Sequence, residues 1–406
     1  MKIALIAGLN AFENFFTDIL GISKEDFLTK YEKDWIFEYA KMLETYGIEL
    51  VVYFFSKRTK RLELRKHLPS GCMIKFIPVN PLYKIFSHFP KSHPYLQYIS
   101  SSSPGLFFDL KEERPSLIYL QEYATGKYDV VALYSKILNI PLIGAYQGGK
   151  EYFFQKPIKK ITYKIAKHLL CINRDETKRM LNNYPFLKNR LSFVPNPIDS
   201  KFFHQIEKNV AKKRLDLNLK KRYVLFVGRL HRFKRRSRKG VDFLIETFHD
   251  VSKLRDDVEL IIVGSGSDEA KHKTRVRKME LKNVRFEGLV FDRKKLLYYY
   301  NASEFIVLPS PVEPFGQVIR EAMACGKTAI GSNVGGIKDV IVDRVNGFLL
   351  HSGDVEEMKE KMLFLLDNPE ICRNMGLNAM RKIKKDYTFE SIGNKLFQIF
   401  KQAVEN

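Results

Sequence analysis

The amino-acid sequence predicts an α/β protein built from two doubly wound parallel-sheet domains. Short β-branched runs alternate with amphipathic helical segments in both halves of the 406-residue chain. Strand, helix and strand in that order favour parallel strands joined by right-handed crossovers. A chain of this length also exceeds what one hydrophobic core usually holds, so two domains are expected.

The first domain is expected to span residues 1–203. It opens with a strand at residues 2–7, after which Gly8 stands where the chain should turn toward a helix. Apolar residues at helical spacing predict a helix at residues 35–43. The other expected strands are residues 50–55, 117–120, 142–145, 169–172 and 191–194, and the other expected helices are residues 129–138, 156–169 and 175–181.

The second domain is expected over residues 223–386, after a linker at residues 204–222 that is rich in Lys, Arg and Asn. Residues 387–406 contain a final amphipathic helix. The expected strands are residues 223–227, 258–263, 284–288, 305–308, 328–331 and 346–350. The expected helices are residues 241–248, 296–302, 317–324, 355–368 and 369–384.

The composition describes a soluble globular protein with a strongly basic balance. Sixty-nine Lys and Arg against 46 Asp and Glu give a net charge of +23, which attracts phosphates in nucleic acid, anionic lipid or nucleotides alike. Four cysteines without metal-ligand spacing indicate a reducing compartment. The opening apolar run is too short for a signal peptide, and none approaches the roughly 20 residues of a membrane span. A cytoplasmic protein is therefore expected.

The stretch from Leu308 to Gly336 predicts a site for an anionic, hydroxyl-rich ligand. A buried strand ends at Leu308, prolines and Gly316 interrupt regular structure, and a helix follows. The start of such a helix presents backbone N–H groups and a positive dipole end to an anion. Glu313 and Glu321 lie beside it and suit hydroxyl groups as hydrogen-bond partners. A nucleotide sugar has both kinds of group.

Glu313-Pro-Phe-Gly-Gln317, Glu321-Ala-Met-Ala-Cys-Gly326 and Gly335-Gly336 together resemble the signature of family 4 of the retaining glycosyltransferases. The resemblance implies the GT-B fold, in which two Rossmann-like domains face each other across a cleft and the C-terminal helix crosses back to the first domain. It also implies that Glu313 binds donor-sugar hydroxyls and Glu321 the nucleotide ribose. The other donor-binding residues implied in this stretch are Pro314, Phe315, Gly316 and Gln317.

A second signature of the same family is similar to Gly228-Arg229-Leu and the later Lys239-Gly240. The resemblance implies that Arg229 and Lys239, with Glu313, are catalytic, the two cations holding the donor diphosphate as the glycosidic bond breaks. Lys234 is a competing candidate because the basic segment between the motifs is long. Lys239 is preferred, since it directly precedes a helix. Gly228, Gly266 and Val290 complete the implied donor side.

The acceptor half of the sequence carries less information. Gly8 stands where the family often has a glycine-rich loop, and Gln147 stands where many members carry a histidine beside the reacting sugar. Gln147 suits either a sugar hydroxyl or a loop-stabilising amide contact. Pro195-Asn-Pro-Ile-Asp199 resembles the turn that closes the first domain of the family.

Three basic segments raise the question of an anionic membrane surface. Residues 57–67 suit a solvated face, and residues 81–98 mix aromatic and basic side chains as membrane-interface segments do. The third segment, residues 156–169, is a basic helix with Ile158, Ile161, Ile165 and Leu169 on one face. Packing of that face against a sheet is favoured, and a membrane-surface helix is the alternative.

The sequence is thus interpreted as a retaining glycosyltransferase of the hexosyltransferase type. It is expected to move a sugar from a nucleotide diphosphate donor to a hydroxyl acceptor, either lipid-linked or a cell-surface glycan precursor, without a metal or other cofactor. The alternatives are another GT-B enzyme, such as a nucleotide-sugar epimerase or a phosphorylase, and a basic nucleic-acid-binding protein. The latter has no recognised binding motif in this chain.

Overall fold

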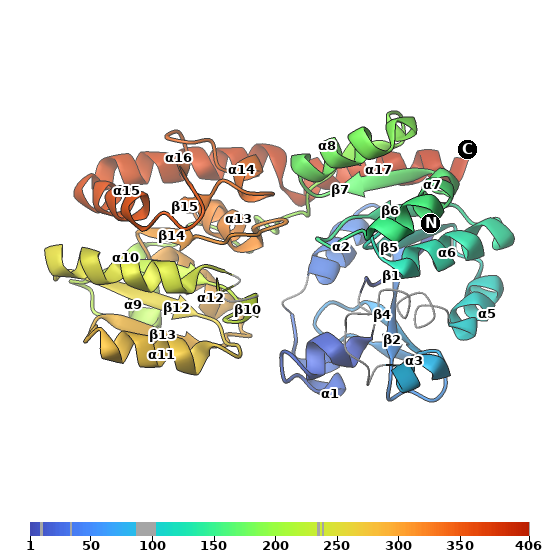
Figure 1. The fold of residues 1–406 in the computed structure, drawn as a ribbon, viewed down its shortest axis with the longest axis horizontal. Coiled ribbons are helices and arrows are strands. Elements are labelled where there is room, and N and C mark those ends of the chain that lie inside the picture. The colour runs from blue at the N-terminus through green and yellow to red at the C-terminus, as the bar shows by residue number, and fades with distance from the viewer. Residues whose placement is uncertain (9–10, 33–34, 87–102, 234–235, 238, 406) are drawn as a thin grey trace. The chain divides into compact units, whose positions relative to one another are not determined.

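The computed structural model describes residues 1–8, 11–32, 35–86, 103–233, 236–237 and 239–405. The chain forms two compact units (Figure 1). The first comprises Met1–Asn196 and Ile392–Asn406, and the second comprises Pro197–Ser391. Among the described residues, no helix is both long and apolar enough to cross a membrane.

The first unit contains a sheet with strand order β3-β4-β2-β1-β5-β6-β7-β8. All neighbouring pairs are parallel except β3 and β4, which are antiparallel. The strands are β1 (Lys2–Ile6), β2 (Glu49–Ser56), β3 (Glu63–Lys66), β4 (Met73–Pro78), β5 (Leu117–Gln121), β6 (Leu142–Ala145), β7 (His168–Cys171) and β8 (Leu191–Phe193). Each strand expected in this half is therefore present.

Helices pack on both faces of this sheet. Apolar residues of α5, α6, α7 and α8 share one core with alternate residues of β1 and β2. On the other face, the Tyr119 ring of β5 contacts Tyr39 of α2 and Phe400 of α17. The α-helices are α1 (Lys24–Thr29), α2 (Trp35–Glu44), α3 (Pro81–Phe86), α5 (Pro104–Glu113), α6 (Gly126–Leu138), α7 (Lys156–Ile165), α8 (Arg174–Asn183) and α17 (Phe389–Glu405). There are also a short π-helix, η1 (Glu13–Thr17), and two 3-10 helices, η2 (Phe153–Gln155) and η3 (Pro185–Leu187).

The second unit is organised around a parallel sheet of order β13-β12-β9-β14-β15-β16. Its strands are β9 (Arg222–Val227), β12 (Val258–Val263), β13 (Val284–Gly288), β14 (Phe305–Leu308), β15 (Thr328–Ser332) and β16 (Gly347–Leu350). Its helices are α9 (Lys208–Arg214), α10 (Val241–Leu254), α11 (Glu269–Lys278), α12 (Arg293–Ala302), α13 (Gln317–Ala324), α14 (Ile337–Val340), α15 (Val355–Asp367) and α16 (Pro369–Asp386). Two short strands, β10 (Arg232–Phe233) and β11 (Arg236–Ser237), form an antiparallel pair.

Some elements carry too little apolar periodicity to be expected from the sequence. In α11 only His272 and Val276 are buried, so most of this helix is a polar surface. Residues 204–222, expected as a linker, lie within the second unit. There Ala211 of α9 is buried in the hydrophobic core.

Candidate functional site

The centre of the candidate site in the second unit is an ion pair between Lys239 and Glu313. The Lys239 ammonium contacts Glu313 Oε2, and both side chains are largely buried. Glu313 Oε1 accepts a hydrogen bond of 3.1 Å from the backbone N–H of Gly316, which caps the start of α13. Lys239 directly precedes Gly240, the cap of α10. The pair therefore joins the N-terminal ends of two helices that follow the neighbouring strands β9 and β14.

Glu313 is held in its ionised form. Burial opposes ionisation of its carboxyl group, but the charge of Lys239 and hydrogen bonds from Lys239 and from the Gly316 and Phe315 N–H groups outweigh that cost. The net result is a pKa below the ordinary value for glutamate. Glu313 is consequently an acceptor of hydrogen bonds, which suits it to hydroxyl groups of a ligand.

Two glycines permit the close approach of the loops around this pair. Gly240 has φ +72°, and a Cβ atom there would lie 2.1 Å from the carbonyl oxygen of Pro309. Gly335 has φ +44°, and a Cβ atom there would lie 2.3 Å from the carbonyl oxygen of Glu313. A side chain at either position would push the loops apart and adds backbone strain. The glycines of the two sequence motifs thus have a defined steric role.

Arg320 holds the loop that contains Glu313 in place through hydrogen bonds, a role that the sequence analysis did not predict. This arginine is fully buried in α13, and its guanidinium donates to the carbonyl oxygens of Phe315 and, at 3.1 Å, Gly336. It also lies 3.8 Å from the centroid of the Phe315 ring. A buried cation that binds two carbonyl groups fixes the path of residues 313–316. An arginine on the apolar face of a predicted helix was the available signal.

Glu321 and Gln317 lie on α13 beyond this loop. Tyr300 donates a 2.6 Å hydrogen bond to Glu321 Oε2, and both side chains are buried. Gln317 is half-buried, and its Oε1 atom accepts no hydrogen bond within the described part of the chain. Gln317 thus holds a buried acceptor that is unsatisfied among the described residues, whereas Glu321 is oriented by Tyr300.

The loops that contain Gly228 and Gly266 contact each other closely, beside the Lys239–Glu313 ion pair. Leu230 N–H donates to the carbonyl of Ser265 at 2.9 Å, and a Cβ atom on Gly266 would lie 2.5 Å from Leu230 O. A Cβ atom on Gly228 would lie 3.5 Å from Lys239 Cγ, which places that glycine against the lysine. These contacts bring Gly228, Gly266 and Lys239 to one edge of the sheet.

The remaining predicted donor-side residues differ in exposure. Arg229, next to Gly228, and Pro314, next to Glu313, are half-buried, whereas Phe315 is buried. Val290 is also buried and belongs to the hydrophobic core, so only its backbone could face a ligand. Lys234, the competing candidate for the diphosphate lysine, lies outside the described residues.

In the first unit, Glu122 connects the two residues predicted on the acceptor side. Its Oε2 atom accepts hydrogen bonds from the N–H groups of Gln147 at 3.1 Å and Gly149 at 2.5 Å. A Cβ atom on Gly8 would lie 2.4 Å from the carbonyl oxygen of Gln121 and 2.7 Å from Glu122 Cβ. The Gln147 side-chain amide donates to Gln121 Oε1 at 2.6 Å. Gly8, Gln147 and Glu122 thus meet where β1, β5 and β6 end.

Glu122 has two unusual properties that the sequence did not indicate. Its backbone has φ +88°, a region that non-glycine residues rarely adopt. Burial raises the pKa of its carboxyl group to about 7, although the N–H groups of Ala124, Gly149 and Gln147 act against the rise. Strain and a perturbed carboxyl at one position are features of functional sites. A glutamate immediately after a buried strand was the only sequence signal.

The family model for glycosyl transferases group 1 matches residues 207–382. A GDP-mannose-dependent alpha-mannosyltransferase of Corynebacterium glutamicum is 30% identical over 320 residues, which cover 74% of this chain and 71% of that protein.

Solved structures show the fold of the chain. Sucrose-phosphate synthase from Thermosynechococcus elongatus matches with a TM-score of 0.77 at 18% identity, covering 99% of both chains. Anabaena HepE in complex with UDP matches with a TM-score of 0.74 at 16% identity, covering 99% of this chain and 100% of that one. The same protein in complex with UDP-glucose matches with a TM-score of 0.70 at 15% identity and the same coverage. The expected GT-B fold is confirmed.

Proposed function

Because the chain belongs to the glycosyl transferases group 1 family and is a glycosyltransferase, we propose that it transfers a hexose from a nucleotide diphosphate sugar to a hydroxyl acceptor with retention of anomeric configuration. The observation that carries the proposal is the Lys239–Glu313 ion pair at the starts of α10 and α13. A cation, an ionised carboxylate and two helix N-termini at one place suit a ligand with both phosphate and hydroxyl groups.

The donor is bound by groups with separate tasks. Lys239 and Arg229 hold the diphosphate and neutralise the charge that grows on the leaving oxygen as the glycosidic bond breaks. Glu313 accepts hydrogen bonds from sugar hydroxyls, the Phe315 and Gly316 backbone groups lie against sugar and phosphate, and Gln317 adds an acceptor. Glu321, oriented by Tyr300, accepts from the ribose. Two of the compared proteins are named for or solved with GDP-mannose and UDP-glucose, which supports a hexose donor.

Retention follows if the acceptor hydroxyl approaches from the side that the diphosphate leaves. The departing phosphate oxygen then takes the acceptor proton, so a separate nucleophilic residue is not required. Gly8, Gln147 and Glu122 are proposed to position the acceptor, with Glu122 and Gln147 as its polar contacts. The acceptor class proposed is a lipid-linked or cell-surface glycan precursor, which agrees with the net charge of +23.

The decisive experiment measures nucleoside diphosphate release and the anomeric configuration of the product from a panel of UDP- and GDP-hexoses. Glu313→Ala, and Arg229→Ala combined with Lys239→Ala, should each abolish turnover. Lys253→Ala is the matched control, since this exposed lysine lies at the far end of α10 and should leave turnover unchanged. Intact turnover in both site variants would refute the site assignment, and an inverted product would refute retention.

A further inference from the structure

Helix α7 turns an unexpected face toward the protein. Lys159, Thr162 and Tyr163 are its buried residues, whereas Ile158 and Ile161 are exposed. Burial of Lys159 is compensated by an ion pair with Asp129 at 3.1 Å and by donation to the carbonyl oxygen of Tyr123 at 2.6 Å. The packing expected through the isoleucines is therefore wrong for Ile158 and Ile161, which are exposed, and holds only for Ile165, which packs against the core.

The outward face of α7 has two parallel stripes. Lys156, Lys160 and Lys164 are exposed and recur every four residues, so they form one cationic row along the helix. Ile158, Ile161 and Ile165 recur at spacings of three and four and form an apolar row beside it. Ile165, at one end of the row, packs partly against the core, but Ile158 is 41% and Ile161 65% exposed, so burial within this unit does not account for these two. Adjacent cationic and apolar rows are typical of a helix that lies in a membrane interface.

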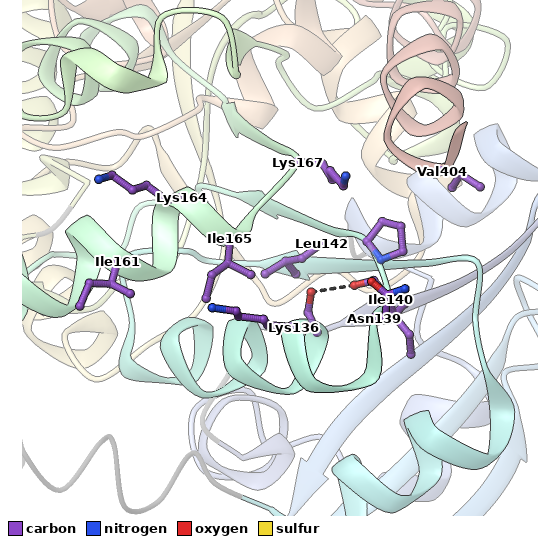
Figure 2. Close-up of a pocket in the computed structure, with 11 residues that line it drawn as sticks. Lys136, Asn139, Ile140, Leu142, Ile161, Lys164, Ile165, Lys167 and Val404 are labelled. Atoms are coloured by element: carbon purple, nitrogen blue, oxygen red, sulfur yellow. Dashed lines mark hydrogen bonds between the residues drawn. The ribbon is translucent and has the colours of Figure 1, made fainter. Parts of the chain in front are cut away.

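The same surface continues onto α6 across a pocket of about 800 Å³. Figure 2 shows Lys136 on α6 and Lys164 on α7 on opposite sides of it, with Ile161 and Ile165 between the helices. Ile137, next to Lys136, is 69% exposed. We define the α6–α7 surface by its residues Lys136, Ile137, Ile158, Lys160, Ile161 and Lys164.

Within residues 126–170, which include α6 and α7, the exposed charges have one sign. Residues 126–170, all of which the structure describes, include six exposed lysines, at positions 136, 150, 156, 160, 164 and 167, but no exposed aspartate or glutamate. Phe153, on η2 immediately before α7, is 84% exposed. Lysines next to anionic headgroups and apolar side chains at the acyl boundary would satisfy both kinds of residue. Nucleic acid would pair with the lysines but leave the isoleucines in water.

The other basic segments are less suited to this role. In residues 57–67, Arg65 pairs with Glu25 at 2.9 Å, and Glu63 pairs with Lys24 at 2.8 Å, so part of the charge is internally neutralised. The aromatic segment at residues 81–98 lies mostly outside the described residues. Among these three basic segments, the one that contains α7 is described throughout and combines exposed lysines with exposed apolar side chains.

From these observations we infer that the α6–α7 surface docks on an anionic phospholipid membrane. The isoleucines enter the headgroup–acyl boundary, and the lysines contact lipid phosphates. This docking does not depend on sugar transfer, so it stands or fails separately from the proposed reaction. It would place the first unit at the surface where a lipid-linked acceptor resides.

Vesicle sedimentation tests the docking with the full chain and no sugar donor. Wild-type protein should bind phosphatidylglycerol–phosphatidylcholine vesicles and not vesicles of phosphatidylcholine alone. Lys160→Gln with Lys164→Gln should weaken binding about 30-fold, since each lysine near an anionic surface contributes a factor of about five. Ile137→Ser with Ile161→Ser should weaken it by roughly tenfold or more through lost apolar burial. All four positions are exposed, so thermal unfolding should match the wild type.

Two matched controls decide whether the surface is specific. Lys60→Gln with Arg61→Gln removes two exposed cations from the competing basic segment, and Lys384→Gln with Lys385→Gln removes two from α16. Both variants should bind vesicles within about a factor of five of the wild type. Equal losses in all three charge variants would show that net charge alone drives binding and would overturn the inference. Unchanged binding in the isoleucine variant, with equal affinity for single-stranded DNA, would overturn the lipid assignment.

Discussion

The two units hold a buried glutamate at the carboxyl edge of each sheet, and the two carboxyl groups behave in opposite ways. Glu313 pairs with Lys239, and its pKa is lowered despite burial. Glu122 accepts hydrogen bonds from three backbone N–H groups, and burial raises its pKa to about 7. Backbone dipoles alone therefore do not offset desolvation here, whereas a full positive charge does. The Glu313 carboxylate is therefore an acceptor of hydrogen bonds, whereas the Glu122 carboxyl group titrates near neutral pH.

The largest expected effect on turnover comes from removing the Lys239 ammonium, which lowers the pKa of Glu313. Lys239→Met leaves the Glu313 carboxyl buried without its ammonium, so the pKa of Glu313 should rise above the ordinary glutamate value. Loss of a diphosphate cation should lower kcat by about 10²–10³-fold. A pH series of turnover checks both points, because a new dependence on pH should accompany the loss. Wild-type turnover in this variant would leave Lys234 as the better candidate.

Arg320→Met tests whether the Glu313 environment depends on its buried support. The substitution removes the donors to the Phe315 and Gly336 carbonyl oxygens and should lower the free energy of unfolding by about 3 kcal/mol. Urea denaturation measures the change. Arg381→Met, at an exposed position on α16, is the control. A loss no greater than that of the control would mean that the loop is held by other contacts.

Glu122→Gln tests the acceptor-side half of the comparison through pH. Because the folded pKa is raised to about 7, the stabilising contribution is fully present below the unfolded glutamate pKa and is lost as pH rises through about 7. The slope cannot exceed about 1.4 kcal/mol per pH unit for one group. Measured between pH 4.5 and 8, the free energy of unfolding should decrease with rising pH in the wild type. It should decrease equally in Glu112→Gln, the control at an exposed position. If Glu122→Gln showed the same decrease in the free energy of unfolding, the pH dependence would not come from the Glu122 carboxyl group.

Tyr300→Phe should have the smallest effect. It removes the 2.6 Å hydrogen bond to Glu321 Oε2 without changing the backbone of α13. A loss of about 1 kcal/mol corresponds to a rise of roughly fivefold in the KM for the donor, with kcat nearly unchanged. Steady-state kinetics with varied donor concentration measures this split. A fall in kcat alone would indicate that Glu321 acts elsewhere than on the nucleotide.

The sequence motifs located more of the candidate donor site than of the candidate acceptor side, for a physical reason. Lys239 and Glu313 are 74 positions apart, yet parallel strands deliver their loops to one edge, and glycine-rich motifs mark both loops. Strand cores such as β12 and β14 agree residue for residue with the apolar runs. Glu122 has no such glycine-rich motif beside it. Its raised pKa comes from burial between loops that lie far apart in sequence.

The outward face of α7 shows where periodicity fails. An isoleucine row normally predicts the packed side of a helix, because burial of apolar surface stabilises the fold. Here Lys159 occupies that side, because Asp129 and backbone carbonyl groups satisfy its ammonium. Those partners come from other segments of the chain. Only the structure could therefore show which face is buried.

Calorimetric binding of a nucleoside diphosphate to wild type, Lys239→Met and Glu122→Gln tests the central claim most directly. The account predicts that affinity falls at least about 30-fold in Lys239→Met, through loss of a charge-assisted phosphate contact, and stays within about twofold in Glu122→Gln. Wild-type affinity in Lys239→Met, or an equal loss in Glu122→Gln, would contradict the assignment of the donor to the Lys239–Glu313 centre.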